Sequence, residues 1–150
     1  RNYAVELAKK LNADLEIVEI SAWLHDIGSI IVGRKDHHIT GAKIAEEKLL
    51  ELDYPKEKIK AVKSCILTHR GSQKMKPETM EAQILIEADA MSAFEDVTGI
   101  FQAAFAYEGL SRVDAKKSVI QKLENKWNQF SDEAKEIIQP KYNAIQLLLK

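Results

Sequence analysis

His25 and Asp26 stand side by side at the end of an apolar run and two residues before Gly28. An imidazole nitrogen and a carboxylate oxygen can bind the same cation, and this mixture of ligands suits Mn, Fe, Co, Ni or Zn. An adjacent His-Asp pair can also be an ordinary polar pair at a helix end. The pair alone therefore raises the possibility of a metal site and does not establish one.

The other histidines and one aspartate strengthen the metal interpretation. We expect His38 to open a helix, His69 to close another, and Asp89 to lie beside the apolar face of a third. A carboxylate in that position should be hydrogen-bonded, paired or metal-bound, although a surface-turned Asp89 is the ordinary alternative. His37 is expected to be an exposed loop residue. The single cysteine, Cys65, excludes a structural zinc site of the finger kind.

Apolar residues recur at three- and four-residue spacing along most of the chain, which predicts an all-α protein with seven or eight helices. The predicted helices cover approximately residues 2–11, 15–25, 38–52, 55–70, 78–95, 100–107, 114–128 and 131–150. We expect Asp14 to cap the second helix, Gly28 to stop it in a left-handed conformation, residues 29–37 to form a loop, and Pro140 to kink or split the last helix. The candidate ligands then come from at least four segments, as in a site inside a helix bundle.

Composition narrows the function classes further. The chain has 150 residues, 45% of them apolar and 30% charged, and a net charge of −1. These values are typical of one soluble globular domain and favour neither a long nucleic acid nor a membrane as partner. No apolar run approaches the roughly 20 residues that span a bilayer, and no signal peptide is visible. We therefore expect a cytoplasmic protein.

Four motifs, in a fixed order, are similar to those of a known family. They are Leu24-His25-Asp26-Ile27-Gly28, His38-Ile39-Thr40-Gly41-Ala42, Thr68-His69-Arg70-Gly71 and Glu87-Ala88-Asp89-Ala90-Met91. The set resembles the HD superfamily of metal-dependent phosphohydrolases over residues 1 to about 110, and above all its small stand-alone members. The resemblance implies a compact HD-domain-like bundle in which residues 1–150 form one domain, with an HD core at 1–110 and further helices at 111–150.

The resemblance also implies the roles of individual residues. His25, Asp26 and Asp89 would be metal ligands, and His38 and His69 lie where two-metal members place extra ligands. The cofactor would be one or two divalent ions (Mn, Fe, Co, Ni, Zn or Mg). Asp26 and His69 would be catalytic. Asp26 would orient the attacking water, and His69 or His38 would bind a second metal or protonate the leaving group.

The expected substrate is a small phosphate ester such as a nucleotide. Arg70 could hold a phosphate oxygen in a bidentate contact, and Lys43 is a second candidate anion contact, with solvated surface as its ordinary alternative. A homodimer is possible.

Two departures from the family pattern leave other functions open. The family places a further histidine about one turn upstream of Arg1, where we expect that this chain starts too late to contain it, and Ala90 stands where close relatives often carry a basic residue. Both departures favour a catalytically silent metal- or nucleotide-binding module as the alternative to an enzyme. A di-iron oxygenase is a third possibility.

Overall fold

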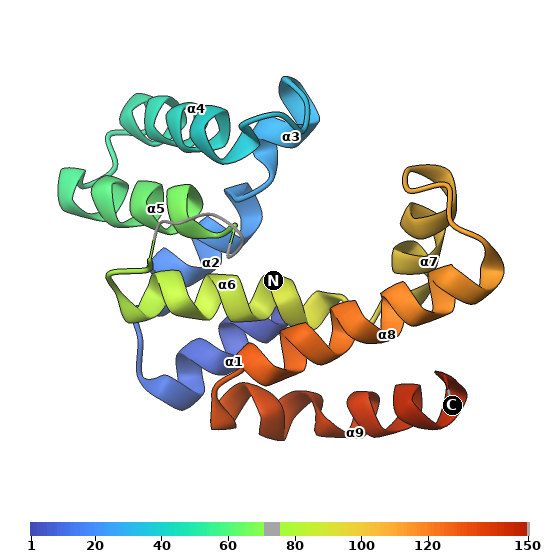
Figure 1. Ribbon diagram of the computed structural model, residues 1–150. Coiled ribbons are helices and arrows are strands. Elements are labelled where there is room, and N and C mark those ends of the chain that lie inside the picture. The colour runs from blue at the N-terminus through green and yellow to red at the C-terminus, as the bar shows by residue number, and fades with distance from the viewer. Residues whose placement is uncertain (71–75, 150) are drawn as a thin grey trace. The chain divides into compact units, whose positions relative to one another are not determined.

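The computed structural model describes residues 1–70 and 76–149, and in these ranges α-helices joined by short turns and loops make up the chain (Figure 1). The helices in these ranges are α1 (Asn2–Leu11), α2 (Leu15–Leu24), α3 (Ile27–Ile31), α4 (His37–Glu51), α5 (Lys56–Thr68), α6 (Met80–Ser92), α7 (Val97–Ala106), α8 (Arg112–Gln129) and α9 (Asp132–Leu149). The prediction of an all-α protein is confirmed. The short helix α3 is the element beyond the eight that were predicted.

The helices divide into two compact units, one of residues Arg1–Ala88 and one of Asp89–Lys150, with the boundary inside α6. The expectation that residues 1–150 form one domain, with an HD core at 1–110, stays a prediction. No helix in residues 1–70 and 76–149 is long and apolar enough to cross a membrane.

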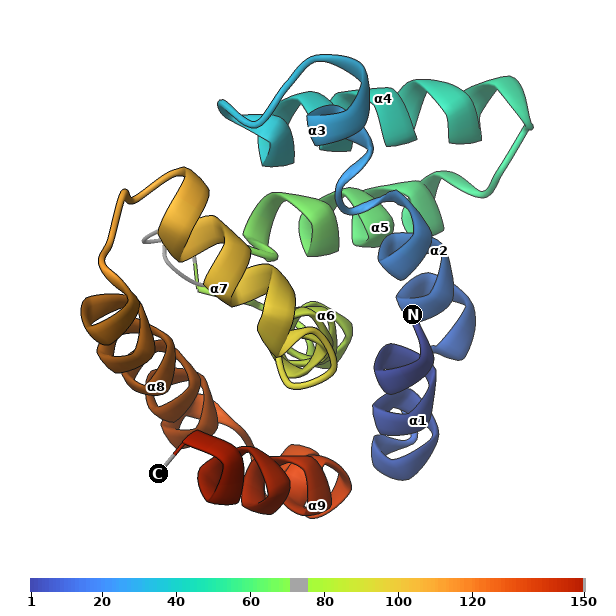
Figure 2. The ribbon, with the colours of Figure 1, turned by 90° about the vertical axis from the view of Figure 1, so that its right-hand side faces the viewer.

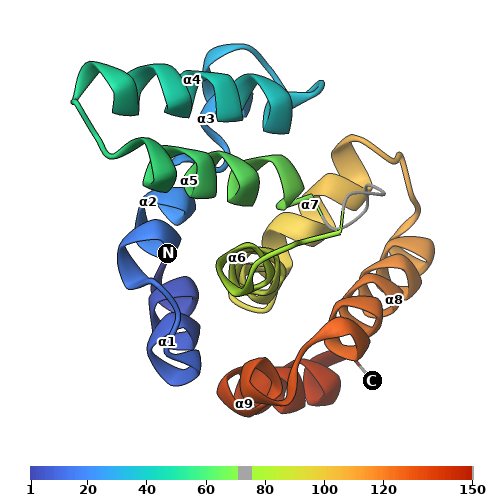
Figure 3. The same ribbon diagram turned by 90° about the vertical axis from the view of Figure 1, so that its left-hand side faces the viewer.

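The first unit is built on the antiparallel pair α4 and α5, with α2 packed against α5 and α1 against α2 (Figure 2). Figure 3 shows the same pair from the opposite side, with the start of α4 beside α3. Large side chains that are fully buried fill the space between these helices, among them Leu7, Val18, Val62 and Ile66. The apolar spacing of the sequence thus marks the inner face of each helix.

Local capping sets where α2 begins. The Asp14 carboxylate accepts hydrogen bonds from the backbone N–H groups of Glu16 and Ile17, at 3.1 and 3.2 Å. These bonds satisfy two of the donors that a helix start leaves without partners. The predicted capping role of Asp14 is confirmed.

The segment after His25 differs from the prediction. Gly28 does not stop α2 in a left-handed conformation but lies inside α3, and residues 29–31 are helical instead of a loop. Gly28 packs on the first turn of α4: a Cβ atom built on it would lie 2.6 Å from the Gly41 nitrogen and closer still to the His37 carbonyl oxygen. A glycine is needed here for close packing and not for its φ angle.

The second unit is held by aromatic contacts between helices. The Trp127 and Tyr142 rings stack at 4.0 Å between centroids, and Phe94 lies 5.7 Å from Phe130. Helix α9 runs through Pro140 as one element, so the expected split at this proline does not occur.

The Gly28 contact yields a stability prediction. Gly28→Ala should lower the free energy of unfolding by about 3 kcal/mol, because the added methyl group meets backbone atoms that cannot rotate away. It should also weaken metal binding, since α3 and α4 must separate. Chemical denaturation followed by circular dichroism measures the stability.

Gly109→Ala is the control. Gly109 has a φ of 63°, but no atom lies within 4 Å of the position that a Cβ atom would take there. Only the cost of the left-handed conformation therefore remains, about 1 kcal/mol. Equal losses for the two variants would show that the contact between α3 and α4 is not tightly packed.

Candidate metal centre

Three side chains from separate helix ends meet in the first unit. The Asp26 Oδ1 atom lies 3.2 Å from His37 Nε2 and 3.7 Å from His69 Nε2, and the two imidazole Nε2 atoms are 3.2 Å apart. His25 Nε2 lies 3.5 Å from the other Asp26 oxygen. These atoms form a compact set of nitrogen and oxygen donors of the kind that binds a divalent ion.

The helix ends explain why these side chains converge. Asp26 precedes the first residue of α3, His37 is the first residue of α4, and His69 follows the last residue of α5. The His69 side chain is only 3% exposed, whereas that of Asp26 is 53% exposed. The donor set is therefore closed on the histidine side and open to solvent on the carboxylate side.

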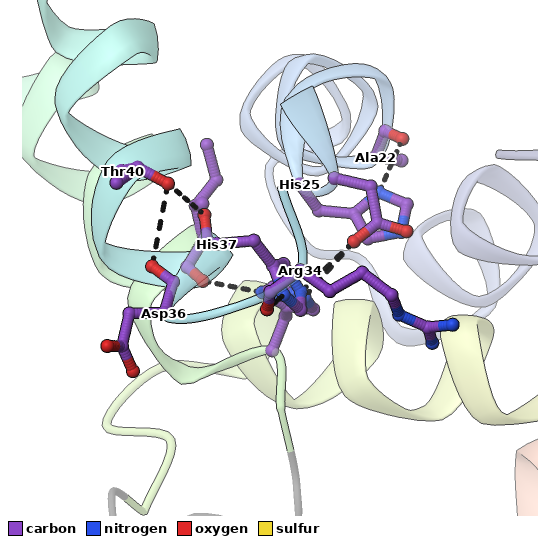
Figure 4. A network of polar contacts seen from close by, with 9 residues as sticks. Ala22, His25, Arg34, Asp36, His37 and Thr40 are labelled. Atoms are coloured by element: carbon purple, nitrogen blue, oxygen red, sulfur yellow. Dashed lines mark hydrogen bonds and ion pairs between the residues drawn. The ribbon is translucent and has the colours of Figure 1, made fainter. Parts of the chain in front are cut away.

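Backbone carbonyl groups fix the tautomer of three histidines. In each, Nδ1 lies within hydrogen-bonding distance of the carbonyl oxygen three residues earlier, and Figure 4 shows two of these contacts. The pairs are His25 with Ala22 at 3.0 Å, His37 with Arg34 at 2.9 Å, and His69 with Ile66 at 2.6 Å. A carbonyl oxygen only accepts, so Nδ1 carries the hydrogen and each neutral ring presents the lone pair of Nε2.

This arrangement fits a metal ion. Two Nε2 lone pairs at 3.2 Å repel each other unless a proton or a cation lies between them. Nitrogen ligands bound at about 2.0–2.1 Å to one metal ion lie roughly 2.9–3.4 Å apart. The distances from His37 Nε2 to His69 Nε2 and to Asp26 Oδ1 are both 3.2 Å, inside that range, and the distance from His69 Nε2 to Asp26 Oδ1 is slightly longer, 3.7 Å.

The Asp26 carboxyl group is strongly acidic. Its pKa is lowered to about 2, first by a hydrogen bond from His69 and then by the charges of His25, His69 and His37, while burial opposes the shift. These three rings lower the pKa when they are protonated, because Nε2 then carries a hydrogen and each ring is a cation. Asp26 is consequently ionised at neutral pH and offers both oxygens to a cation.

The structure places His37 in this group where the sequence pattern favoured His38. His37 was expected to be exposed in a loop, but it is the first residue of α4 and its side chain is 12% exposed. His38 is buried, its Nδ1 has no hydrogen-bond partner in the described part of the chain, and burial lowers its pKa. Adjacent helical residues point about 100° apart, so His37 and His38 cannot both face the same point.

One signal in the sequence could have identified His37. It lies four residues before Gly41, so the two share a helix face. A Cβ atom built on Gly41 would lie 3.3 Å from the Gly28 nitrogen and 3.5 Å from the His25 carbonyl oxygen. The face of α4 that packs on the His25–Gly28 segment therefore carries His37.

The remaining candidates lie in different settings. Arg70 is half-buried beside His69, and its charge contributes to the lowered pKa of His38. Lys43 is exposed and pairs with Glu47 at 3.8 Å, as a solvated helix surface does. Asp89 is exposed and is the first residue of the second unit. The roles proposed for these three residues stay predictions.

A family comparison agrees with this geometry. The family model of the HD domain matches residues 2–93. The chain belongs to the HD-domain family. Members of this family are typically metal-dependent phosphohydrolases that bind divalent ions, and the group of Asp26, His37 and His69 could hold one here. The match is shorter than the expected range of 1 to about 110.

Two curated relatives match part of the chain. A tRNA (cytidine(56)-2'-O)-methyltransferase of Picrophilus torridus is 28% identical over 119 residues, which are 75% of this chain and 35% of the relative. Ribonuclease Y of Alkaliphilus metalliredigens is 36% identical over 87 residues, 58% of this chain and 17% of the relative. The chain thus spans about a third or less of the length of these proteins. No solved structure matches.

Substituting His37 and His38 separately tests which of the two histidines binds the metal ion. His37→Gln should weaken Mn²⁺ or Zn²⁺ binding by at least about 10–100-fold, because even an outer partner of a metal site is worth that much. His38→Gln should keep the affinity within about threefold, less than such a partner contributes. Calorimetric titration of both variants measures this. A larger loss for His38→Gln would assign the ligand to His38.

The acidity of Asp26 is a second measurable property. In the metal-free protein the Asp26 carboxyl should titrate near pH 2, and His69→Ala should raise its pKa toward the ordinary 3.8 because the largest cause is removed. Since the folded pKa is lowered, the ionised carboxylate stabilises the fold above about pH 4, and this contribution disappears as the pH falls through about 2. Carboxyl ¹³C NMR titration measures the pKa.

His38→Gln is the matched control for this titration, because His38 is not among the groups that lower the pKa of Asp26. A pKa near 3.8 for Asp26 in the unaltered protein would contradict the arrangement of imidazoles around the carboxylate.

Proposed function

We propose that this protein is a metal-dependent phosphohydrolase that acts on a small phosphate ester such as a nucleotide. The observation that carries the proposal is the pair of facing Nε2 atoms, 3.2 Å apart, beside the ionised Asp26. The family supports hydrolysis as the chemistry, and the open carboxylate side supports access for a substrate.

Asp26, His37 and His69 would hold the ion, with His25 next to Asp26. A divalent ion bound there would polarise the phosphoryl group and make water acidic enough to supply hydroxide near neutral pH. Asp26 has a second oxygen directed toward His25, and this oxygen can accept a hydrogen bond from the attacking water and orient it. The carbonyl anchor on His69 Nδ1 holds its ring in place while the substrate binds.

Cationic side chains near the site support an anionic substrate. Arg70 follows His69 directly and can donate two parallel hydrogen bonds to a phosphate group. Lys43 is the weaker candidate, because it already pairs with Glu47. We retain His38 as a possible proton donor to the leaving group, since its Nδ1 lacks a partner in the described part of the chain.

A second class of substrate competes with the small phosphate ester. Both curated relatives have names that refer to RNA, which favours an RNA phosphodiester as the second candidate. The net charge of −1 favours small substrates, because binding of a long polyanion depends on many cationic side chains. A catalytically silent metal- or nucleotide-binding module and a di-iron oxygenase remain the alternative functions.

A substrate screen tests the proposal. Nucleoside monophosphates, cyclic nucleotides and a short RNA should be incubated with the protein and Mn²⁺, Co²⁺, Ni²⁺, Zn²⁺ or Mg²⁺, with release of phosphate or cleavage as the measurement. We expect hydrolysis of at least one small ester that a chelator abolishes. Metal binding without turnover would favour the silent module, and iron-dependent oxygen consumption would favour the oxygenase.

Substitution of Asp26 tests the metal assignment most directly. Asp26→Ala should lower turnover at least about a thousandfold, because the change removes both a donor of the site and the group that orients water. Asp36→Asn is the matched control: it removes a negative charge next to His37, but Asp36 is not in the donor set. Near-native activity of Asp26→Ala at saturating Mn²⁺ or Co²⁺ would show that the metal assignment is wrong.

A further inference from the structure

A cavity of about 400 Å³ lies within the second unit, and none of the residues of the candidate metal centre lines it. Its lining comes from α7, the first turns of α8 and the C-terminal end of α9, which Figure 1 shows on the same side of this unit. The lining residues are Phe101, Phe105, Arg112, Lys116, Leu148 and Leu149. The volume is within the range of roughly 300–1,000 Å³ that is typical of small-molecule sites.

Apolar side chains form most of the lining. The rings of Phe101 and Phe105 lie one helical turn apart on α7 and stack with 6.1 Å between their centroids. Leu148 is 81% exposed, and Phe105 is also exposed. Exposed apolar groups that gather around a concavity are typical of a binding surface, because covering them removes apolar area from water.

Two cations lie on the same side of the cavity. Arg112 and Lys116 are four residues apart on α8, so their side chains project from one helix face. In residues 1–70 and 76–149, the guanidinium group of Arg112 makes no hydrogen bond or ion pair with another side chain. Asp114, the nearest acid on this helix, accepts a hydrogen bond from the Ser111 hydroxyl at 2.6 Å.

We propose that this cavity binds an amphipathic anion, a carboxylate or phosphate monoester on an apolar body about the size of a medium-length alkyl chain. The guanidinium group can pair with two anionic oxygens at once, and the aromatic and leucine side chains cover the apolar body. A small anion would leave the apolar lining exposed to water, and a neutral apolar molecule would leave the guanidinium group of Arg112 without an anionic partner. Charge complementarity and apolar area together therefore specify both ends of the ligand.

Calorimetric titration with decanoate and with decyl phosphate tests the proposal and distinguishes the two head groups. We expect saturable binding of at least one of them, with one molecule per chain. Decanol, which has the tail without the charge, and acetate, which has the charge without the tail, should bind at least about tenfold more weakly, because each lacks one class of contact.

The variants separate this site from nonspecific binding. Arg112→Gln combined with Lys116→Gln should weaken binding of the anion at least about tenfold, and Phe105→Ser should weaken binding of the anion and of decanol alike. Lys117→Gln is the matched control, because it removes a positive charge from the neighbouring position of α8 outside the lining. Circular dichroism of each variant checks that the helices persist.

Three outcomes would overturn the proposal. The first is equal affinity for decanoate in the double variant and the control. The second is a molecular mass that doubles with concentration and returns to the monomer value in Phe105→Ser, which would assign the surface to a second copy of the chain. The third is binding to phosphatidylglycerol vesicles without binding of free decanoate or decyl phosphate, which would assign it to a bilayer.

Discussion

The hydrogen bond from a histidine Nδ1 to the carbonyl oxygen three residues earlier is the interaction on which the candidate metal centre depends. It occurs at His25, His37 and His69. Helix residues supply the carbonyl groups for His25 and His69, and the loop residue Arg34 supplies the one for His37, so the backbone holds each ring. Every one of these rings then directs Nε2 toward Asp26, and the site combines neutral nitrogen donors with a single anionic oxygen ligand.

That geometry in turn requires close packing of two helices. Gly28 on α3 and Gly41 on α4 face each other across a contact that leaves no space for a side chain at Gly28. The contact brings the first turn of α4 against the segment that carries His25 and Asp26. Thr40 supports the same turn, since its hydroxyl donates to the His37 carbonyl oxygen at 3.3 Å. Packing of the backbone and chemistry of the site are therefore coupled.

The two units carry different candidate binding sites. The first carries the donor set of the candidate metal centre, on residues that lie within the HD-domain match. The second carries a cavity with aromatic, leucine and cationic side chains that do not belong to that donor set. Aromatic contacts among Phe94, Trp127, Phe130 and Tyr142 join helices within the second unit.

The sequence by itself determined the helical class, the capping role of Asp14 and the choice of Asp26 and His69 as candidate ligands, which the structure places in one group, because apolar periodicity, capping residues and ligand types act locally. Only the tertiary structure decided which of two adjacent histidines joins the donor set. That choice depends on the rotation of α4 about its axis, which the contact with Gly28 sets. Helix α3, whose five residues are too few to be stable alone, packs on α4 through the same contact. Long-range packing therefore decided what local propensity left open.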